Sequence, residues 1–393
     1  MTTEAVVIVA AKRTPMGGFM GALSGADATE LGATAIASAL ADAGLNESAI
    51  DEVIMGCVLP AGLGQAPARQ AMLKAGLARA TGATTINKVC GSGLKATMLA
   101  HDLIKAGSIN TAVAGGMESM TNSPYFIPKA RGGMRMGHGE IKDHMMSDGL
   151  EDAYDNKAMG CFAQDTADEY GIKREQMDTF ALSSLSKANE AIEKGHFTAE
   201  IAPHTINTRK GDVTVSVDEQ PGNARPEKIP SLRAAFKKDG TITAANSSSI
   251  SDGGAALILM SESHAKAQGL TPLCRIVAHS THSQKPSEFT LAPVGAMNSL
   301  LEKAGWTTAD VDLWEINEAF AMVTMLAINE LKLDESKVNV NGGACALGHP
   351  IGASGARILV TLIHALKNRG LKKGVASLCI GGGEAVALAV EAV

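Results

Sequence analysis

A repeated segment constrains the fold of this chain more than any other feature of its sequence. Residues 43–53 read AGLNESAIDEV and align without a gap with residues 304–314, which read AGWTTADVDLW. An apolar-rich predicted helix precedes each copy, and a strand end follows it, at Met55 and at Ile316. Each half then continues with a helix and a strand that ends in glycines. We therefore predict an α/β fold of two duplicated halves, with strands buried between helix layers.

The first half opens with local signals for a strand and a helix. Residues 5–11 (AVVIVAA) predict a buried strand, followed by a polar turn over residues 12–15 that ends in a proline. A helix is expected over residues 28–43, because Asp27 can cap its start together with a glutamate three residues later and Gly44 can end it.

The segment between the two copies differs in composition and is predicted to be an insertion. Residues 120–249 contain a stretch rich in glycine, methionine and charge, one amphipathic helix expected over residues 174–193, and a stretch marked by prolines. Such a segment is expected to cover an active site rather than to form a large core. The predicted N-terminal half spans residues 1–119 and is completed by about 250–271, and the predicted C-terminal half spans residues 272–393.

Length, charge and cysteine usage exclude several classes of protein. At 393 residues, the chain exceeds the size at which one hydrophobic core keeps growing. Its net charge is −6 and it has no block of like charges, which argues against nucleic acid and anionic membranes as partners. The six cysteines lack CxxC spacing and indicate neither a zinc site nor a disulfide framework. The N-terminus lacks the features of a signal peptide, so a reducing, cytoplasmic location is expected.

Cys90 stands in the segment NKVCGSG, residues 87–93, directly before a predicted helix. Unpaired backbone N–H groups and the positive end of the helix dipole should stabilise a thiolate there. The pKa of Cys90 is therefore expected to fall, which would make its sulfur a nucleophile near neutral pH. Taken alone, the same motif also fits a buried structural cysteine.

Three further stretches carry residue types that suit the chemistry of a nucleophilic cysteine. His349 precedes the second-half helix that corresponds to the helix after Cys90, and could act as a base. Cys379 could move a proton to or from a carbon acid, and the glycines 381–383 could hold an oxyanion with their N–H groups. Asn317, like Cys379, lies at a strand end, where open α/β sheets bind ligands. Each residue alone also fits a structural role in packing, capping or a turn.

These motifs together resemble the signature motifs of the thiolases, the acetyl-CoA acetyltransferases. They occupy residues 87–93, 317–321, 339–343, 348–352 and 379–383. The resemblance covers essentially the whole chain, and several long motifs in the order of the family argue against a chance match. It implies a thiolase fold, in which two duplicated α/β halves stack as alternating helix and sheet layers and the inserted loop domain covers coenzyme A.

The resemblance also implies roles for individual residues. Cys90 would be the nucleophile that accepts the acyl group, and His349 would activate it. Cys379 would be the acid/base that protonates the departing acetyl-CoA enolate or deprotonates acetyl-CoA. Asn317 would position a water that forms one oxyanion hole with His349, and the backbone N–H groups of Cys90 and Gly381 would form the other.

The same resemblance implies a set of coenzyme A contacts: Leu150, Met159, Phe236, Ala244, Ser248, Ala319 and Phe320. Three other positions depart from the pattern of many short-chain thiolases. Ala158 replaces a histidine that lines the pantetheine and acyl pocket, and Gly222 replaces an arginine that contacts the adenine end of coenzyme A. Phe289 puts an aromatic ring near the expected acyl tail. These departures keep the reaction class and leave the preferred acyl length open.

The implied activity is thiolysis of 3-ketoacyl-CoA or, in reverse, Claisen condensation of two acetyl-CoA molecules, as part of fatty acid metabolism. Coenzyme A and acyl-CoA would be substrates, with no cofactor, no metal, and a homodimer or homotetramer as the assembly. Two alternatives remain open. A ketoacyl carrier-protein synthase usually contains a His-Gly-Thr stretch, which this sequence lacks. A non-catalytic acyl carrier on the same fold would not need Cys90, His349 and Cys379.

Overall fold

The strands of both halves form one ten-stranded sheet in the computed structural model, which describes residues 4–393. The first half contributes five neighbouring strands in the order β4 (Gly82–Ile86), β3 (Glu52–Gly56), β5 (Thr111–Ser119), β10 (Ser251–Ser261) and β1 (Val6–Arg13). The second half continues with β11 (Cys274–Ser283), β14 (Glu384–Ala392), β13 (Lys373–Ile380) and β12 (Leu313–Ile316). The short strand β2 (Gly17–Gly18) pairs with β10.

The two halves meet at a narrow seam, where Val7 of β1 pairs with Arg275 of β11. Away from this seam, both halves repeat the same directions, with two antiparallel pairings followed by a parallel one. An irregularity also recurs, because the register shifts after Ile8 in β1 and after Ile276 in β11. The predicted duplication of an α/β unit is therefore confirmed.

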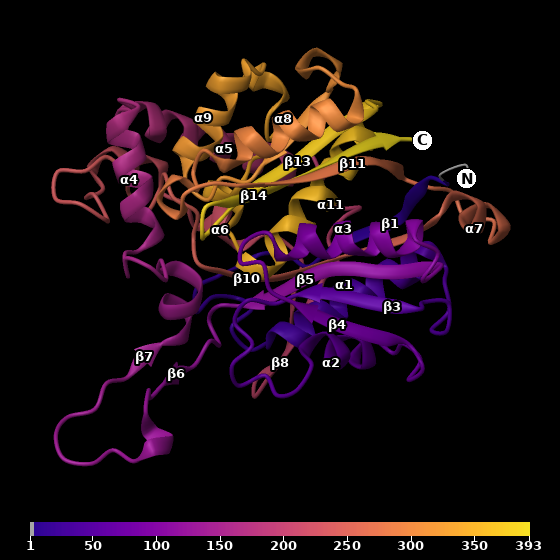
Figure 1. Ribbon diagram of the computed structural model, residues 1–393, viewed down its shortest axis with the longest axis horizontal. Coiled ribbons are helices and arrows are strands. Elements are labelled where there is room, and N and C mark those ends of the chain that lie inside the picture. Colours follow the sequence, from indigo (N-terminus) through magenta and orange to yellow (C-terminus); the bar gives the residue numbers. More distant parts are fainter. Residues whose placement is uncertain (1–3) are drawn as a thin grey trace.

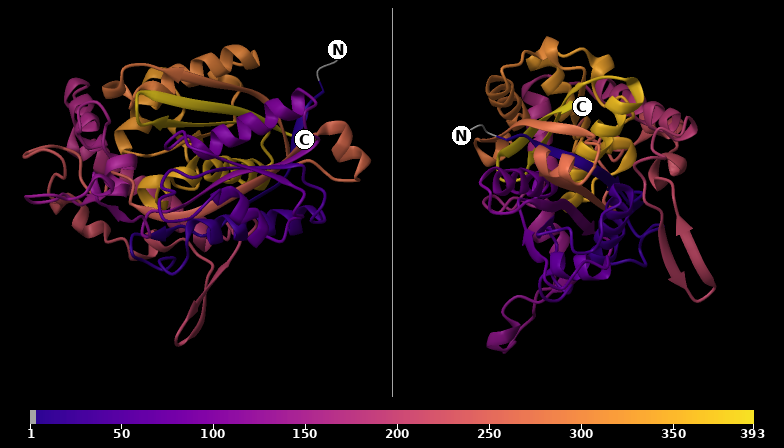
Figure 2. Two further views of the ribbon diagram at one scale, coloured as in Figure 1. Left: turned by 60° about the horizontal axis from the view of Figure 1, so that its bottom comes forward. Right: turned by 90° about the vertical axis from the view of Figure 1, so that its right-hand side faces the viewer.

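Helices lie on both faces of each half of the sheet (Figure 1 and Figure 2). Outer helices cover the faces that point away from the molecular centre: α1 (Ala28–Ala43), α2 (Pro67–Lys74), α8 (Ala292–Ala304) and α9 (Ala321–Leu331). Two helices, α3 (Ser92–Lys105) and α11 (Ile351–Arg369), lie in the middle and contact strands of both halves as well as each other. Shorter helices, α7 (Glu262–Ala267) and α10 (Ala344–Leu347), complete the two halves.

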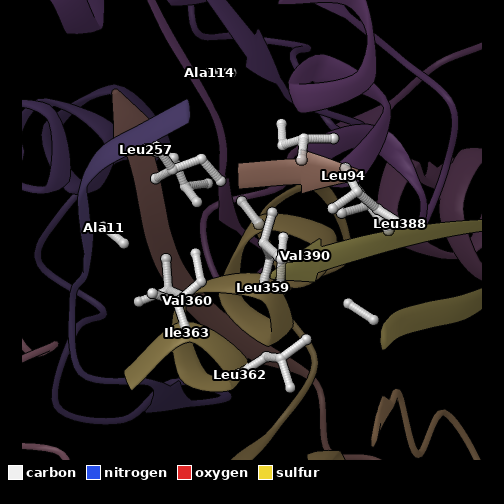
Figure 3. Close-up of a cluster of buried hydrophobic side chains, with 14 of the residues drawn as sticks. Ala11, Leu94, Ala114, Leu257, Leu359, Val360, Leu362, Ile363, Leu388 and Val390 are labelled. Carbon is white, nitrogen blue, oxygen red and sulfur yellow. The ribbon is translucent and has the colours of Figure 1, made fainter. Parts of the chain in front are cut away.

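The largest hydrophobic cluster surrounds the two central helices. Its buried side chains come from α3, α11 and the strands of both halves, including Leu94, Leu257, Leu359 and Leu388 (Figure 3). Smaller clusters lie under the outer helices of each half. Because one cluster contains side chains from both halves, the halves are packed together as a single core.

Local signals account for the ends of α1. The Asp27 carboxylate accepts a hydrogen bond of 2.9 Å from the Glu30 N–H, and the Glu30 carboxylate accepts one of 2.8 Å from the Asp27 N–H. Gly44 ends the helix with a φ of 64°. The predicted helix and its capping box are therefore confirmed, as is the helix predicted in the insertion, α5 (Arg174–Glu193).

The prediction of a polar turn at residues 12–15 was wrong. β1 continues through Arg13, which is fully buried. Its guanidinium donates hydrogen bonds of 2.7 and 2.9 Å to the Asp218 carboxylate and one of 2.6 Å to Glu200. These partners lie 205 and 187 residues along the chain, so no local pattern could indicate that the arginine is paired and buried.

The insertion leaves the layered body between β5 and β10. Its longer helices, α4 (Met159–Glu169) and α5, lie beside the second half, and α6 (Glu219–Asn223) follows them. Two hairpins project from the body, β6 (Tyr125–Phe126) with β7 (Lys142–Asp143) and β8 (His204–Thr208) with β9 (Gly211–Val215) (Figure 2). The domain limits given above remain predictions. None of the helices within residues 4–393 is long and apolar enough to cross a membrane.

Candidate active site

A cavity of about 430 Å³ opens beside the starts of α3 and α11, under the insertion. Both halves and the insertion contribute to its walls. The predicted site residues that line it are Cys90, Leu150, Met159, Phe236, Ala244, Ser248, Ala319, Phe320, His349, Cys379 and Gly381. Asn317 does not line the cavity and is buried beside His349 instead. The structure therefore brings together residues that are up to 291 positions apart, from Cys90 to Gly381.

A tight turn holds Cys90 in front of α3. Val89 has a φ of 47°, an uncommon and strained backbone conformation for a β-branched residue. The Ser92 hydroxyl accepts a hydrogen bond of 2.8 Å from the Lys88 N–H and donates one of 2.7 Å to the Val89 carbonyl. The Asn87 side chain accepts a further bond of 2.9 Å from the Val89 N–H. These bonds fix the sulfur at the cavity wall.

The expectation that the pKa of Cys90 falls at the helix start was wrong. Burial raises the pKa of the thiol to about 11, although the N–H groups of Gly381 and of Cys90 itself donate to the sulfur and act in the opposite direction. Desolvation outweighs these backbone dipoles because no cationic side chain within residues 4–393 acts on the sulfur to favour the thiolate. The thiol is therefore neutral at neutral pH, and a base must take its proton when it reacts.

His349 offers the cavity a neutral imidazole. Its Nδ1 lies 2.5 Å from the Ser354 hydroxyl, which donates its own proton to the Pro350 carbonyl at 2.9 Å. Nδ1 therefore carries the ring proton, and Nε2 keeps a lone pair. Nε2 is buried and has no hydrogen-bond partner among the described residues. Burial, together with the charge of Arg357, lowers the pKa of His349 to about 3, so the ring stays neutral.

Asn317 and Cys379 complete the predicted set in different ways. The Asn317 amide nitrogen lies 3.5 Å from His349 Nδ1, and its amide oxygen is buried without a partner among residues 4–393. Cys379 is the next-to-last residue of β13 and is almost fully buried. Burial, with a smaller contribution from the neighbouring Cys90 thiol, holds the pKa of Cys379 far above its usual value. Cys379 is therefore a thiol that can donate a proton.

Glu118 is a buried residue near the site that sequence reasoning did not assign. It is the next-to-last residue of β5, and its carboxylate accepts hydrogen bonds from the N–H groups of Val58, Leu59 and Gly352 at 2.8–3.1 Å. Burial raises the pKa of Glu118 to about 7, and the three N–H groups oppose this rise. The bond to Gly352 attaches the first turn of α11, and so His349, to β5. In the sequence, Glu118 was marked only as a glutamate that follows the glycines of a predicted strand.

Other cavity residues were not assigned individually from the sequence, because small, apolar and serine residues of this kind carry no distinctive pattern by themselves. They are Met120, Met146, Gly149, Gly160, Ala235, Ser247, Ser249, Ile250 and Ile351. Of the positions that depart from the thiolase pattern, Ala158 and Phe289 line the cavity, whereas Gly222 lies on α6 and faces open space. The Phe289 ring packs edge-on against Phe320 at 6.4 Å between centroids.

Comparison with known proteins places the chain and its fold in one family. Residues 6–263 match the model of the thiolase N-terminal domain, and residues 270–392 match that of the thiolase C-terminal domain. Proteins named acetyl-CoA acetyltransferase from Escherichia coli and Pseudomonas aeruginosa are 51% and 50% identical to this chain, with 98% of each chain covered.

Solved structures agree with these relatives. The crystal structure of the Bacillus anthracis acetyl-CoA acetyltransferase superposes with a TM-score of 0.97 at 44% identity, covering 100% of this chain and 99% of the other. An Ascaris suum thiolase in complex with coenzyme A gives a TM-score of 0.94 at 40% identity, covering 99% and 100%.

The layers and the thiol-containing cavity define a duplicated α/β protein with a candidate active site between its halves and the insertion. The chain belongs to the thiolase family.

Proposed function

We propose that this thiolase, an acyltransferase, cleaves 3-ketoacyl-CoA with coenzyme A and, in reverse, condenses two acetyl-CoA molecules to acetoacetyl-CoA. One observation carries the proposal: Cys90, His349, Cys379 and Gly381 line the same cavity although they come from distant parts of the chain. Two thiols, a neutral imidazole and backbone N–H groups are the functional groups that this reaction needs.

In the thiolytic direction, the Cys90 sulfur attacks the C3 carbonyl of the 3-ketoacyl-CoA while His349 Nε2 takes the thiol proton. The C2–C3 bond then breaks, the acyl group stays on Cys90 as a thioester, and the electron pair leaves with acetyl-CoA as its enolate. The Cys379 thiol protonates that enolate at carbon. The coenzyme A thiol then gives its proton to the Cys379 thiolate, and its sulfur attacks the acyl carbon on Cys90. The bond between that carbon and the Cys90 sulfur breaks, and the sulfur takes back the proton held by His349.

Backbone N–H groups would stabilise the negative charge that forms on oxygen in these steps. Those of Cys90 and Gly381 already donate to the Cys90 sulfur, so they face the reacting atom. Asn317 would hold a water that forms the second oxyanion hole with His349. The Asn317 amide would contact this water from a position next to the His349 ring, since Asn317 does not line the cavity.

The cavity walls would receive the pantetheine and acyl parts of the substrates. Ser248 donates a hydrogen bond of 3.0 Å to the Ala319 carbonyl, which joins two loops predicted to contact coenzyme A. The small Ala158 and the ring of Phe289 line the same cavity and would set the accepted acyl length. Coenzyme A, acetyl-CoA and 3-ketoacyl-CoA would be the only small molecules required, with no further cofactor.

Thiolysis of a series of 3-ketoacyl-CoA substrates, from acetoacetyl-CoA upward, tests the proposal. Cys90→Ser should lower kcat on the order of 10⁴-fold or more, because the variant loses the nucleophile. Cys161→Ser is the matched control, since Cys161 does not line the cavity. A wild-type protein that is inactive on every substrate would favour the non-catalytic carrier instead.

We also propose a homodimer or homotetramer that acts in the cytoplasm. All six cysteines are free, as expected in a reducing compartment. Apolar side chains are exposed on and between β6 and β7, including Tyr125, Met134, Met136 and Ile141, and an assembly would cover them. Light scattering should give a mass of two or four chains, and a monomer at micromolar concentration would contradict this proposal.

A further inference from the structure

Three side chains outside the proposed reaction meet near the C-terminal end of α3. His101 and Asp102 belong to α3 of the first half, and His279 belongs to β11 of the second half. The Asp102 Oδ1 atom lies 2.9 Å from His101 Nδ1 and 2.9 Å from His279 Nε2. One ligand atom from each of the three residues lies within 4.8 Å of the other two.

These distances suit a shared cation. Zinc binds imidazole nitrogen and carboxylate oxygen at about 2.1 Å, so neighbouring ligand atoms of a tetrahedral site lie roughly 3.4 Å apart around it. Two imidazoles and one carboxylate form a donor set that zinc accepts with water in the remaining position. The ion would replace the protons that now lie between Asp102 and the two rings.

The residues around His101, Asp102 and His279 keep these three side chains in place, and the cluster is open to solvent on one side. His101 is buried, and its ring meets that of His279 edge-on, with 5.0 Å between centroids. Asp102 is exposed over 55% of its side chain, so a cation can reach the cluster from solvent. The nearby Lys303 ammonium is hydrogen-bonded to the His279 carbonyl at 3.2 Å. The negative end of the α3 dipole also favours a cation here.

The position of the cluster separates it from the reaction. His101 follows Cys90 by eleven residues, which is roughly 16 Å along a helix. The cluster joins a helix of the first half to a strand of the second half. An ion bound there would act on the contact between the halves rather than on the substrate.

We propose that His101, Asp102 and His279 bind one zinc ion, which fastens α3 of the first half to β11 of the second half. The inference does not depend on the proposed thiolase reaction. Because the three ligands come together only in the folded chain, zinc binds the folded state selectively and stabilises it.

Zinc titration of the metal-stripped wild-type protein tests the proposal by calorimetry and by the thermal midpoint. We expect one ion per chain and a Tm that rises by several degrees when zinc is in excess. Asp102→Asn is the decisive variant, because the amide oxygen can still accept hydrogen bonds from both histidines while the negative charge is lost. It should keep the Tm of the metal-free protein and lose the zinc-dependent rise. His279→Gln should lose that rise as well, and His264→Gln is the matched control for the removal of one histidine.

The active-site thiols could also hold zinc, so the titration is repeated on the Cys90→Ser, Cys379→Ser double variant. Binding that persists there, and a cobalt complex without the intense absorption of thiolate ligands, would support the cluster as the site. Two results would overturn the proposal: no zinc on the double variant, or zinc binding and a Tm rise that Asp102→Asn and His279→Gln leave unchanged. Either result would make the cluster a hydrogen-bonded clamp only.

Discussion

At the scale of single residues, the same burial acts in opposite directions on the two central groups of the site. It raises the pKa of the Cys90 thiol to about 11 and, together with Arg357, lowers the pKa of His349 to about 3. Both groups are therefore neutral at neutral pH, and no thiolate–imidazolium pair forms before substrate binds. Transfer of the Cys90 proton must accompany attack on the substrate carbonyl, which makes the position of His349 Nε2 as important as its basicity.

The low pKa of His349 predicts how its removal changes stability with pH. The folded pKa is about 3 and the ordinary value is 6.5, so in this range the unfolded chain takes up a proton that the folded chain does not. The stability contributed by His349 is therefore present above pH 6.5 and lost as the pH falls toward 3. For one such group, the slope is up to about 1.4 kcal/mol per pH unit.

We expect the free energy of unfolding of His349→Asn to fall less steeply with decreasing pH than that of the wild type. Urea denaturation at a series of pH values measures these slopes. His138→Asn, at an exposed position, controls for the loss of a histidine. An unchanged slope in His349→Asn would contradict a neutral, buried imidazole.

At the scale of elements, the buried network of Arg13 attaches the insertion to β1. Asp218 accepts both hydrogen bonds of a bidentate pair with the guanidinium and also accepts one of 2.8 Å from the Met16 N–H. Asp218→Asn should lower the free energy of unfolding by about 3 kcal/mol, because it leaves a buried cation poorly compensated. Glu190→Gln breaks the exposed pair with Lys194 and should change stability little. Urea denaturation of both variants provides the comparison, and equal effects would argue against a special role for burial.

The helices α3 and α11 cross so closely that there is no room for a side chain at the glycines between them. A Cβ atom at Gly355 would lie 2.4 Å from the Leu94 backbone nitrogen, and one at Gly93 would lie 2.7 Å from the Ala356 nitrogen. Gly355→Ala should destabilise the protein by about 1–3 kcal/mol, since backbone must move. It should also lower the rate of thiolysis, because these helices carry Cys90 and His349 at their starts. Gly222→Ala, which faces open space, should change stability by less than about 0.5 kcal/mol and serves as the control.

Elements with local signals could be predicted from the sequence, and contacts between distant segments could not. The capping box of α1 and the amphipathic spacing of α5 are encoded within a few residues, so both helices were predicted closely. The thiolase motifs likewise indicated Cys90, His349 and Cys379, which the cavity brings together. The burial of Arg13 and the rise in the pKa of Cys90 depend on surroundings formed by folding, and local reasoning gave the wrong answer for each. The cluster of His101 and His279 also has no sequence signal, because the two residues belong to different halves.

At the scale of the whole molecule, duplication produced a protein whose halves share one core. The repeat predicted two similar units, and the pairing directions and register shifts of the strands confirm them. The repeat could not indicate that α3 and α11 would pack against each other and against both sets of strands. A chain with two similar halves can unfold in two steps only if each half keeps its own core, and the central cluster argues against this.

We therefore expect the two halves to unfold in one cooperative step, in spite of their symmetry. Hydrogen exchange of backbone amides should show equal protection for the central strands β5 of the first half and β13 of the second. Gly355→Ala should lower both protections by the same amount, because the α3–α11 contact belongs to both halves. The projecting hairpin β8–β9 is an internal control, since it should open locally and keep its exchange rates in the variant. Loss of protection confined to β13 would show instead that the second half unfolds alone and that the shared core does not couple the two halves.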